Sequence, residues 1–388
     1  MLGLTSFLTD ASSEMVAAVL PVYALYFLRA SPAAFGVIDG LQQGGASLVR
    51  LAAGWFTDYS RRHKAVAAAG YLASVISKLG LLVVAGSAGA LTLLTLLDRV
   101  GKGIRTAPRD AMISLSVPRA ALASAFGIHR ALDTAGAMLG PVLAFLILAW
   151  IANGYDVVFV VSLALGVVGV AALVLFVDTS SLARTTAEPR HSPGWPRWSA
   201  RFYGIACAAT LLGLATISDS FIYLTLQQKA GFDVKYLPLL FVATPAVYLV
   251  LAVPAGRLAD RIGRPAVIAA GYLGLLALYA ALSSPLPAVL TAVLTVGLLG
   301  AFYAMTDGVF AALASAELPA EQRATGLALV GTGNDVGRLV SSVVFGWLWS
   351  RGSPDAAVVV FVPLLLVAMA VSSIISWRAT PGLPREER

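Results

Sequence analysis

The sequence GWFTDYSRR at residues 54–62 returns in altered form as GRLADRIGR at residues 256–264. Both stretches share the pattern Gly-x-x-x-Asp-x-x-x-Arg, and the second begins 202 residues after the first in a chain of 388 residues. Each stretch ends a long apolar run and precedes another. The pattern therefore predicts a tight turn between two membrane helices, present once in each of two copies of one structural unit.

The composition is that of a protein that crosses a membrane many times. Hydrophobic residues make up 59% and charged residues 12% of the chain, and the mean hydropathy is +0.84, whereas about a quarter of the residues in a soluble domain are charged. An apolar helix of about 20 residues spans a bilayer and satisfies its own backbone hydrogen bonds there. Twelve such helices are predicted, near residues 3–28, 34–57, 65–86, 89–112, 120–150, 155–177, 202–227, 234–258, 266–283, 286–313, 322–349 and 354–377.

The net charge of +7 follows from membrane topology, so no nucleic-acid partner is expected. The loops opposite the termini hold few basic residues, namely Arg29, Lys229, Lys235 and Arg351. Because basic residues favour cytoplasmic loops, we expect a multi-pass protein of an inner (cytoplasmic) membrane, embedded in the lipid bilayer as a monomer, with both termini in the cytoplasm. The loops on the termini side are far richer in basic residues: Arg61, Arg62, Lys64, Arg119, Arg184, Arg190, Arg197, Arg261, Arg264, Arg323, Arg378, Arg385 and Arg388.

A polar segment separates two groups of six predicted helices. This segment contains Pro, Gly, Ser, Thr and Arg without an apolar period, which is typical of a linker. We expect a six-helix bundle at residues 1–178, a cytoplasmic linker at 179–200 and a second six-helix bundle at 201–388. Gly136 and Gly337, which are 201 residues apart, are a further sign of duplication.

The repeated turns resemble the loop signature of the major facilitator superfamily of secondary transporters. That signature, Gly-x-Leu-Ala-Asp-Arg-x-Gly-Arg, is met at residues 256–264, while the first copy departs from it at Tyr59 and Arg61. The resemblance implies an all-α integral membrane protein of 12 transmembrane helices in two pseudo-symmetric six-helix bundles, which works by alternating access. It also implies a gating role for the residues Gly54, Asp58, Arg62, Gly256, Asp260 and Arg264.

Gating by these residues has a physical basis. Glycines let two helices approach closely in a membrane, and a carboxylate near a helix N-terminus or an arginine is stabilised in one global state and released in the other. A static turn with basic flanking residues is the open alternative.

Two more family signatures fall within predicted helices. Arg99 and Gly103 meet an Arg-x-x-x-Gly signature of the fourth helix. A Gly-x-x-x-Gly-Pro signature of the fifth helix, which the family associates with exporters that work by antiport, is also met, with Ala144 in place of a later glycine. Its residues are candidates either for a hinge that takes part in gating or for close packing: Gly136, Gly140 and Pro141.

Charged residues within the predicted spans point to the transport site, because a charge at the bilayer centre costs at least about 2.5–3.5 kcal/mol. Asp98, Lys102, Arg105 and Arg109 are spaced four, three and four residues apart and so share one stripe of the fourth helix. This stripe either contacts an anionic solute in a central cavity or forms internal ion pairs such as Asp98 with Lys102. The substrate-binding candidates are Asp98, Arg99, Lys102, Arg105, Arg130, Asp39, Asp219 and Asp307.

Two carboxylates in the first helix are candidates for proton coupling. Asp10 and Glu14 lie one turn apart, and two such groups are costly to ionise together in a low-dielectric site. His129 and Asp133 in the fifth helix lie at a similar predicted depth and are candidates for a relay, although a membrane histidine is more often a packing residue.

The second half contains fewer charged residues. Asp335 and Arg338, three residues apart, are expected to form a local pair. Asp219 and Asp307 have no basic partner on their own helices, so each either faces the cavity or pairs with another helix.

Enzymatic activity is not expected. Gly101-Lys102-Gly103 lacks the glycine spacing and the following Ser or Thr of a phosphate-binding loop, and His63, His129 and His191 have no metal-ligand spacing. No cofactor or metal is predicted. The expected function is therefore secondary active transport of a small molecule by proton-coupled efflux. Uptake of an anionic metabolite by symport and a membrane receptor without transport are the alternatives.

Overall fold

The computed structural model describes residues 1–388 except 61, 84–86, 117–121, 178–197, 319–322 and 379–388. In the described residues the chain forms helices and no β-strand. The first half of the chain contains α1 (Leu2–Val22), the π-helical turn η1 (Tyr23–Phe27), α2 (Pro32–Ser60), α3 (His63–Val83), α4 (Ala88–Leu115), α5 (Leu122–Trp150) and α6 (Tyr155–Phe176).

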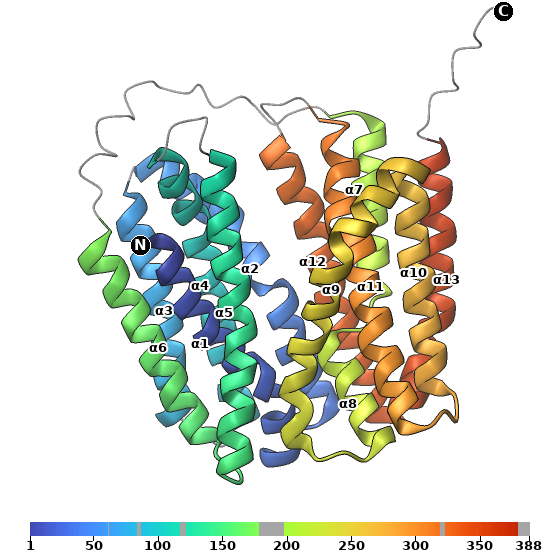
Figure 1. The fold of residues 1–388 in the computed structure, drawn as a ribbon, viewed down its shortest axis with the longest axis horizontal. Coiled ribbons are helices and arrows are strands. Elements are labelled where there is room, and N and C mark those ends of the chain that lie inside the picture. The colour runs from blue at the N-terminus through green and yellow to red at the C-terminus, as the bar shows by residue number, and fades with distance from the viewer. Residues whose placement is uncertain (61, 84–86, 117–121, 178–197, 319–322, 379–388) are drawn as a thin grey trace, which may run out of the picture.

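The second half of the chain repeats this arrangement (Figure 1). Its helices are α7 (Ala200–Leu214), α8 (Asp219–Ala230), the 3-10 turn η4 (Val234–Tyr236), α9 (Leu237–Ile262), α10 (Arg264–Ser283), α11 (Ala288–Ser315), α12 (Arg323–Arg351) and α13 (Pro354–Arg378). The linker predicted at residues 179–200 falls almost entirely outside the described residues.

The pattern of helix packing follows the predicted duplication. In the first half α1 packs on α5 and α6, α4 on α2 and α3, and α3 on α6. In the second half α7 packs on α12 and α13, α11 on α9 and α10, and α10 on α13. Each pair in one half has its counterpart in the other, so the prediction of two pseudo-symmetric bundles is confirmed.

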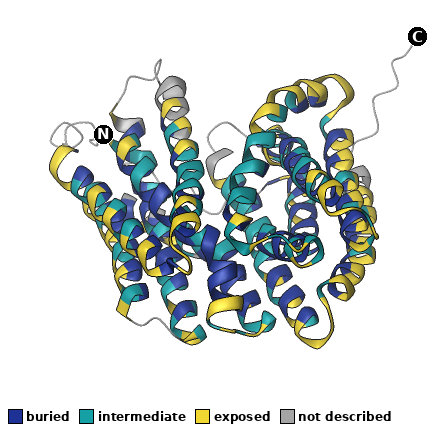
Figure 2. Cartoon of the chain, turned by 60° about the horizontal axis from the view of Figure 1, so that its bottom comes forward, coloured by how far each residue is buried: buried dark blue, intermediate teal, exposed yellow. Residues whose placement is uncertain are grey.

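The predicted spans are confirmed as helices. Eight helical segments of the described chain are long and apolar enough to cross a membrane by length and composition, with α7 and α8 counted as one continuous segment. The long helices α1, α2, α4 and α12 are not among them, and these four carry most of the polar residues described below. Exposed residues lie along the outer surfaces of the bundle (Figure 2). The exposed side chains of the chain include large apolar ones such as Val168, Val250 and Val367. An apolar outer surface of this kind suits contact with lipid.

The seventh predicted span is interrupted rather than continuous. Helix α7 ends at Leu214 and α8 begins at Asp219. The hydroxyl of Tyr279, from α10, accepts a hydrogen bond from the Ile217 amide at 2.7 Å and donates one to the Ala215 carbonyl at 3.1 Å. The Ser218 side chain caps the start of α8. Side chains therefore satisfy the backbone groups that the break leaves open, as a membrane interior requires.

The two halves meet mainly through α2 and α12. A Cβ atom added at Gly36 would lie 2.7 Å from the carbonyl oxygen of Ser342, and one at Gly40 would lie 2.8 Å from that of Leu339. One at Gly44 would lie 2.9 Å from the carbonyl oxygen of residue 335. Glycines four residues apart therefore let the two backbones touch.

We call the end of the molecule where α13 ends the termini face, and the other end the opposite face. The contacts between α2 and α12 lie in the parts of these helices nearest the opposite face. The same region contains a hydrogen bond of 2.7 Å from the Tyr26 hydroxyl to Gln227 and a ring contact of Phe145 with Tyr236. In Figure 1 the two halves converge toward the opposite face and diverge toward the termini face.

The break in the seventh span leads to a stability prediction. Replacing Tyr279 by Phe removes both hydrogen bonds and leaves two buried backbone groups unpaired, at about 1–3 kcal/mol each. We expect the Tyr279→Phe variant to unfold a few degrees below the parent protein in detergent. Tyr203→Phe, at an exposed side chain, is the control and should unfold with the parent. Equal melting temperatures for the two variants would contradict this role of Tyr279.

Candidate functional site

A network of charged side chains fills the interior of the first half, around α4. The stripe predicted on α4 does not form pairs within itself. Instead its members reach α1, α3 and α5, so the predicted alternative of an Asp98–Lys102 pair is wrong. The sequence spacing showed that these residues share a face, but the neighbouring helices supply their partners.

One part of the network surrounds Asp98. Its carboxylate lies 2.9 Å from the Lys78 ammonium of α3 and 2.9 Å from the guanidinium of Arg99. Ser13 of α1 donates to the same carboxylate at 3.5 Å. All three charged residues are buried. Lys78 had not been assigned to the site from sequence, although a lysine in the middle of an apolar helix was a usable signal.

Arg105 occupies the centre of the network. It is 1% exposed, lies 3.3 Å from the Asp10 carboxylate of α1, and donates to Ser74 of α3 at 2.9 Å. Its guanidinium also covers the ring of Tyr71 at 4.8 Å from the centroid. This buried cation is thus held by a carboxylate, a hydroxyl and an aromatic face.

Glycines bring α4 close enough to its neighbours for these contacts. A Cβ atom at Gly101 would lie 2.6 Å from the carbonyl oxygen of Gly70 in α3, and one at Gly103 would lie 2.5 Å from that of Ala46 in α2. The Arg-x-x-x-Gly signature therefore combines a buried charge at Arg99 with a close helix contact at Gly103.

The pair of Glu14 and Lys102 differs from the rest of the network. Their charged atoms are 3.2 Å apart, and the two side chains are 28% and 33% exposed. Both partners of this ion pair are accessible, whereas the other ion pairs of α4 contain at least one nearly buried side chain. Glu14 and Lys102 thus connect the buried network to accessible space.

The predicted relay residues lie at the end of the network. Arg109 is 3.6 Å from the Asp133 carboxylate and 3.0 Å from that of Asp110. His129 is 3% exposed, and its Nε2 atom lies 3.5 Å from Asp133. The structure thus brings Asp133, His129 and Arg109 together. The side chain of Arg130 lies outside the described residues.

A second polar site lies in the other half of the protein. Arg338 of α12 is 3.2 Å from the Asp219 carboxylate and donates to the Tyr303 hydroxyl at 2.8 Å. Tyr303 in turn donates to Asp219. The predicted Asp335–Arg338 pair is therefore wrong. Asp335 instead accepts a hydrogen bond from Ser47 of α2, because α12 presents this residue to the other half.

This second site borders a cavity of about 350 Å³ within the second half. The cavity is lined by residues of α7, α10, α11 and α12, including Asp307, Asn334 and Asp335. Asp307 is exposed, and no hydrogen bond or ion pair joins its carboxylate to the described residues.

Asp39 lies apart from both sites. It is 1% exposed and accepts a hydrogen bond of 2.7 Å from Ser342. Asp39 lies in the contact between α2 and α12. The Asp39–Ser342 hydrogen bond is the counterpart of the Ser47–Asp335 hydrogen bond, so each half contributes one carboxylate and one serine to this contact.

The predicted gating turns lie on the termini face. Gly256, Asp260 and Arg264 border a cavity of about 200 Å³, and Arg264 donates to the Ala312 carbonyl at 2.9 Å. A Cβ atom at Gly256 would meet no atom within 4 Å. The expected close helix contact at Gly256 is therefore absent in this arrangement, in which the halves diverge on that face. Arg62 is exposed, and the side chain of Asp58 and the surroundings of Gly54 lie outside the described residues.

Gly136 and Gly140 of α5 lie in close contact with α1. A Cβ atom at these positions would be 2.3 Å from the carbonyl oxygen of Phe7 and 2.4 Å from that of Ala11. Gly337 has the same place in the other half, where a Cβ atom would be 2.6 Å from the Thr210 carbonyl oxygen. Close packing at these glycines explains their spacing, and Pro141 follows them inside α5.

Comparison with known proteins agrees with this architecture. The sequence model of the Major Facilitator Superfamily matches residues 2–245 and 204–388. The chain belongs to the Major Facilitator Superfamily. It is 31% identical over 363 residues to MJ1317 of Methanocaldococcus jannaschii, described as an MFS-type transporter, with 92% of this chain and 89% of that one covered. It is 26% identical to Rv2265 of Mycobacterium tuberculosis, with 89% and 84% covered.

Solved structures of this superfamily share the fold. The nucleoside transporter NupG superposes with a TM-score of 0.77 at 14% identity, over 97% of each chain. A D-xylose-proton symporter gives a TM-score of 0.70 at 13% identity, over 98% of this chain and 96% of that one. At this identity the likeness concerns the fold. The protein is therefore a multi-pass membrane protein of a secondary transporter family.

The buried charges of this transporter lead to a second stability prediction. Removing one member of a buried ion pair leaves an uncompensated charge, whereas removing both does not. We expect Asp10→Asn and Arg105→Met each to lower the melting temperature in detergent. The loss of stability in the double variant should be smaller than the sum of the two single losses, because no charge is then left without a partner. The coupling free energy should be about 1–3 kcal/mol.

The matched control is the pair of Arg201 and Glu317, which lies at a similar separation of 3.2 Å but is more exposed than the Asp10–Arg105 pair at 3.3 Å. Coupling between Arg201→Met and Glu317→Gln should be under about 1 kcal/mol. Equal coupling free energies for the two pairs would show that burial does not strengthen the interaction of Asp10 with Arg105.

Proposed function

We propose that this protein exports a small molecule from the cytoplasm in exchange for protons, by alternating access of one central site. The observation that carries the proposal is the accessible Glu14–Lys102 pair, which lies at the edge of an otherwise buried and charge-balanced network. An ion pair of this kind changes its energy when its carboxylate takes up a proton. It can therefore link proton binding to the balance of two global states.

The proton pathway proposed here begins at Glu14. Protonation of Glu14 releases Lys102, whose ammonium then seeks another carboxylate or solvent. Asp10 on the next turn of α1 is the nearest such group along the helix, and it is already paired with Arg105. Asp133 and His129 end the same network at Arg109. Rearrangement among these pairs is the proposed coupling between α1, α4 and α5.

Rocking of the halves about the α2–α12 contact is the proposed transport step. In this arrangement the described contacts between halves lie toward the opposite face, so we infer that the space between the halves opens toward the termini face. We assign the termini face to the cytoplasm because its loops carry most of the basic residues. The turns with Gly54, Asp58, Arg62, Gly256, Asp260 and Arg264 would then close in the other state.

The charge balance of the first half bears on the nature of the solute. The five basic residues that form ion pairs in this network are matched by five carboxylates, and each has a carboxylate within 3.6 Å. The carboxylates are those of Asp10, Glu14, Asp98, Asp110 and Asp133. An anion would have to displace one of these carboxylates. Of the two alternatives drawn from sequence, an anionic solute bound by Lys102 and Arg105 therefore has less support than internal ion pairing. We take Asp98 and Arg99 as structural members of the network.

Uptake by symport is the second candidate, because a D-xylose-proton symporter shares this fold. The direction of coupling separates the two. Efflux predicts that an inward proton gradient drives solute out of the cytoplasmic compartment, and symport predicts accumulation there.

The role of Glu14 is testable in proteoliposomes that contain a pH-sensitive dye and a panel of labelled cationic, neutral and anionic compounds. We expect Glu14→Gln to abolish accumulation driven by a pH gradient while downhill exchange continues, because the variant cannot carry the proton. Glu317→Gln removes a carboxylate from the Arg201–Glu317 ion pair, which is not part of the network, and should behave as the parent. Gradient-driven accumulation that persists in Glu14→Gln contradicts the assignment.

A further inference from the structure

The cavity of the second half carries an excess of negative charge. Arg338 is neutralised by Asp219, with which it forms an ion pair supported by Tyr303. Asp335 receives one hydrogen bond, from the hydroxyl of Ser47. Asp307 receives none from the described residues and points into accessible space. Among the residues that the structure describes, one cation, Arg338, thus faces the three carboxylates Asp219, Asp307 and Asp335. The charges of the α4 network balance.

An ionised carboxylate without a partner is expensive inside a membrane protein, and it is commonly a functional group. Neither Arg338 nor any other described basic residue lies within ion-pair distance of Asp307. The cavity therefore offers a ready counter-ion to a positively charged group of a ligand. A negatively charged group would meet repulsion from Asp307 and Asp335 and would compete with Asp219 for Arg338.

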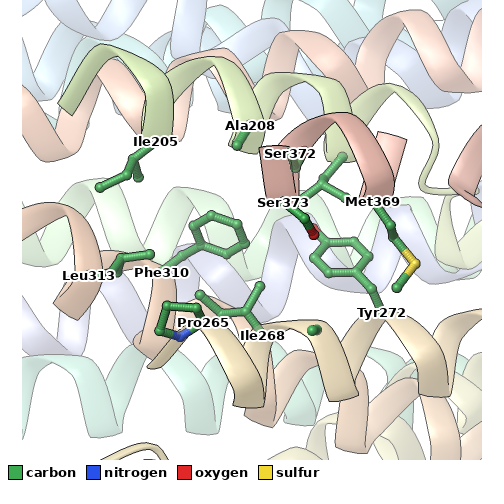
Figure 3. A pocket seen from close by; sticks show the side chains of 12 residues that line it. Ile205, Ala208, Pro265, Ile268, Tyr272, Phe310, Leu313, Met369, Ser372 and Ser373 are labelled. Atoms are coloured by element: carbon green, nitrogen blue, oxygen red, sulfur yellow. The ribbon is translucent and has the colours of Figure 1, made fainter. Parts of the chain in front are cut away.

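A second, apolar compartment adjoins this cavity. It has a volume of about 290 Å³ and lies between α7, α10, α11 and α13. The rings of Tyr272 and Phe310 line both compartments. Figure 3 shows these two rings with aliphatic side chains around them. The apolar members of the lining include Ile205, Leu212, Ile268, Leu313 and Met369.

We propose that the two compartments together bind an amphipathic organic cation, with its ammonium group at Asp307 and its apolar body between Tyr272, Phe310 and the apolar compartment. Each compartment alone is at or near the lower end of ligand-pocket volumes, about 300–1,000 Å³, and together they lie within that range. The rings suit an aromatic body, since aromatic pairs gain energy beyond simple burial.

This inference rests on the proposed function only in taking the bound cation to be the transported solute. Binding itself requires no transport and can be measured on the full chain in detergent. If the organic cation binds but a pH gradient does not drive its flux, the result contradicts the proposed proton coupling and leaves the cation site intact. If the cation does not bind, the result contradicts the cation site and leaves the proposed proton coupling intact.

The test uses three probes with the same ring system and different charge: tryptamine, which is a cation, tryptophol, which is neutral, and indole-3-acetate, which is an anion. Binding to the purified protein is measured by calorimetry near neutral pH. We expect the affinity to decrease in the order tryptamine, tryptophol, indole-3-acetate. Tryptamine should bind roughly tenfold more tightly than tryptophol, because a hydrogen bond to a charged group contributes about the free energy of a tenfold change in affinity.

Two variants locate the binding. Asp307→Asn keeps the shape of the side chain and should reduce the preference for tryptamine over tryptophol to about twofold or less. The control Asp233→Asn removes an exposed carboxylate that pairs with Lys235 outside the cavity, and it should keep the preference. Ala208→Leu narrows the apolar compartment and should weaken tryptamine and tryptophol by similar factors.

Melting temperatures establish that each variant is folded before its affinity is compared. Equal affinity of the parent for tryptamine and tryptophol, or no binding of either, would overturn the proposal. An unchanged preference in Asp307→Asn would also overturn it. If Ala208→Leu binds both probes as the parent does, the assignment of the apolar body to that compartment is wrong.

Discussion

The cost of burying charge in an apolar interior governs the structure of the first half. Arg105, Lys78 and Asp98 are held away from water, and each is tolerated because another helix supplies an opposite charge. Such pairs gain little net stability, but breaking one is costly. The pairs therefore fix how α4 lies against α1, α3 and α5. The glycines at 101 and 103 are required because the side chains must reach across a short gap.

The two halves share one helix arrangement and differ in their charges. The α4 network is balanced and mostly buried, whereas the second half has an open cavity at Asp307, whose carboxylate has no hydrogen-bond or ion-pair partner among the described residues. In the proposed function, this difference separates two tasks. The balanced network responds to a proton at Glu14, and the cavity of the second half holds the solute.

Much of this fold was predictable from sequence, and the limits have a physical cause. The repeated turn predicted two units, and hydropathy predicted the helices with small errors at their ends. Helical spacing also placed Asp98, Lys102, Arg105 and Arg109 on one stripe. Spacing cannot give the rotation of a neighbouring helix, so it did not show that Asp98 pairs with Lys78 and Lys102 with Glu14. The same limit explains why Arg338 was assigned to Asp335 instead of Asp219.

Two other features were missed for different reasons. The break between α7 and α8 is stabilised by Tyr279, which lies on another helix, and no local sequence signal at the break identifies that contact. The contact of α2 with α12 did leave a signal, because Gly36, Gly40 and Gly44 are spaced four residues apart. That spacing is typical of close helix contacts in membranes, and it could have identified the surface about which the halves are proposed to rock.

The most direct test of this account measures distances across both faces of the same protein. In a Cys207→Ser background, spin labels at Ser31 and Asp233 report on the opposite face, and labels at Arg62 and Arg261 report on the termini face. In liposomes at high and low pH, alternating access predicts that one distance lengthens as the other shortens. Distances on both faces that stay fixed, or that change together, would contradict the rocking of two halves.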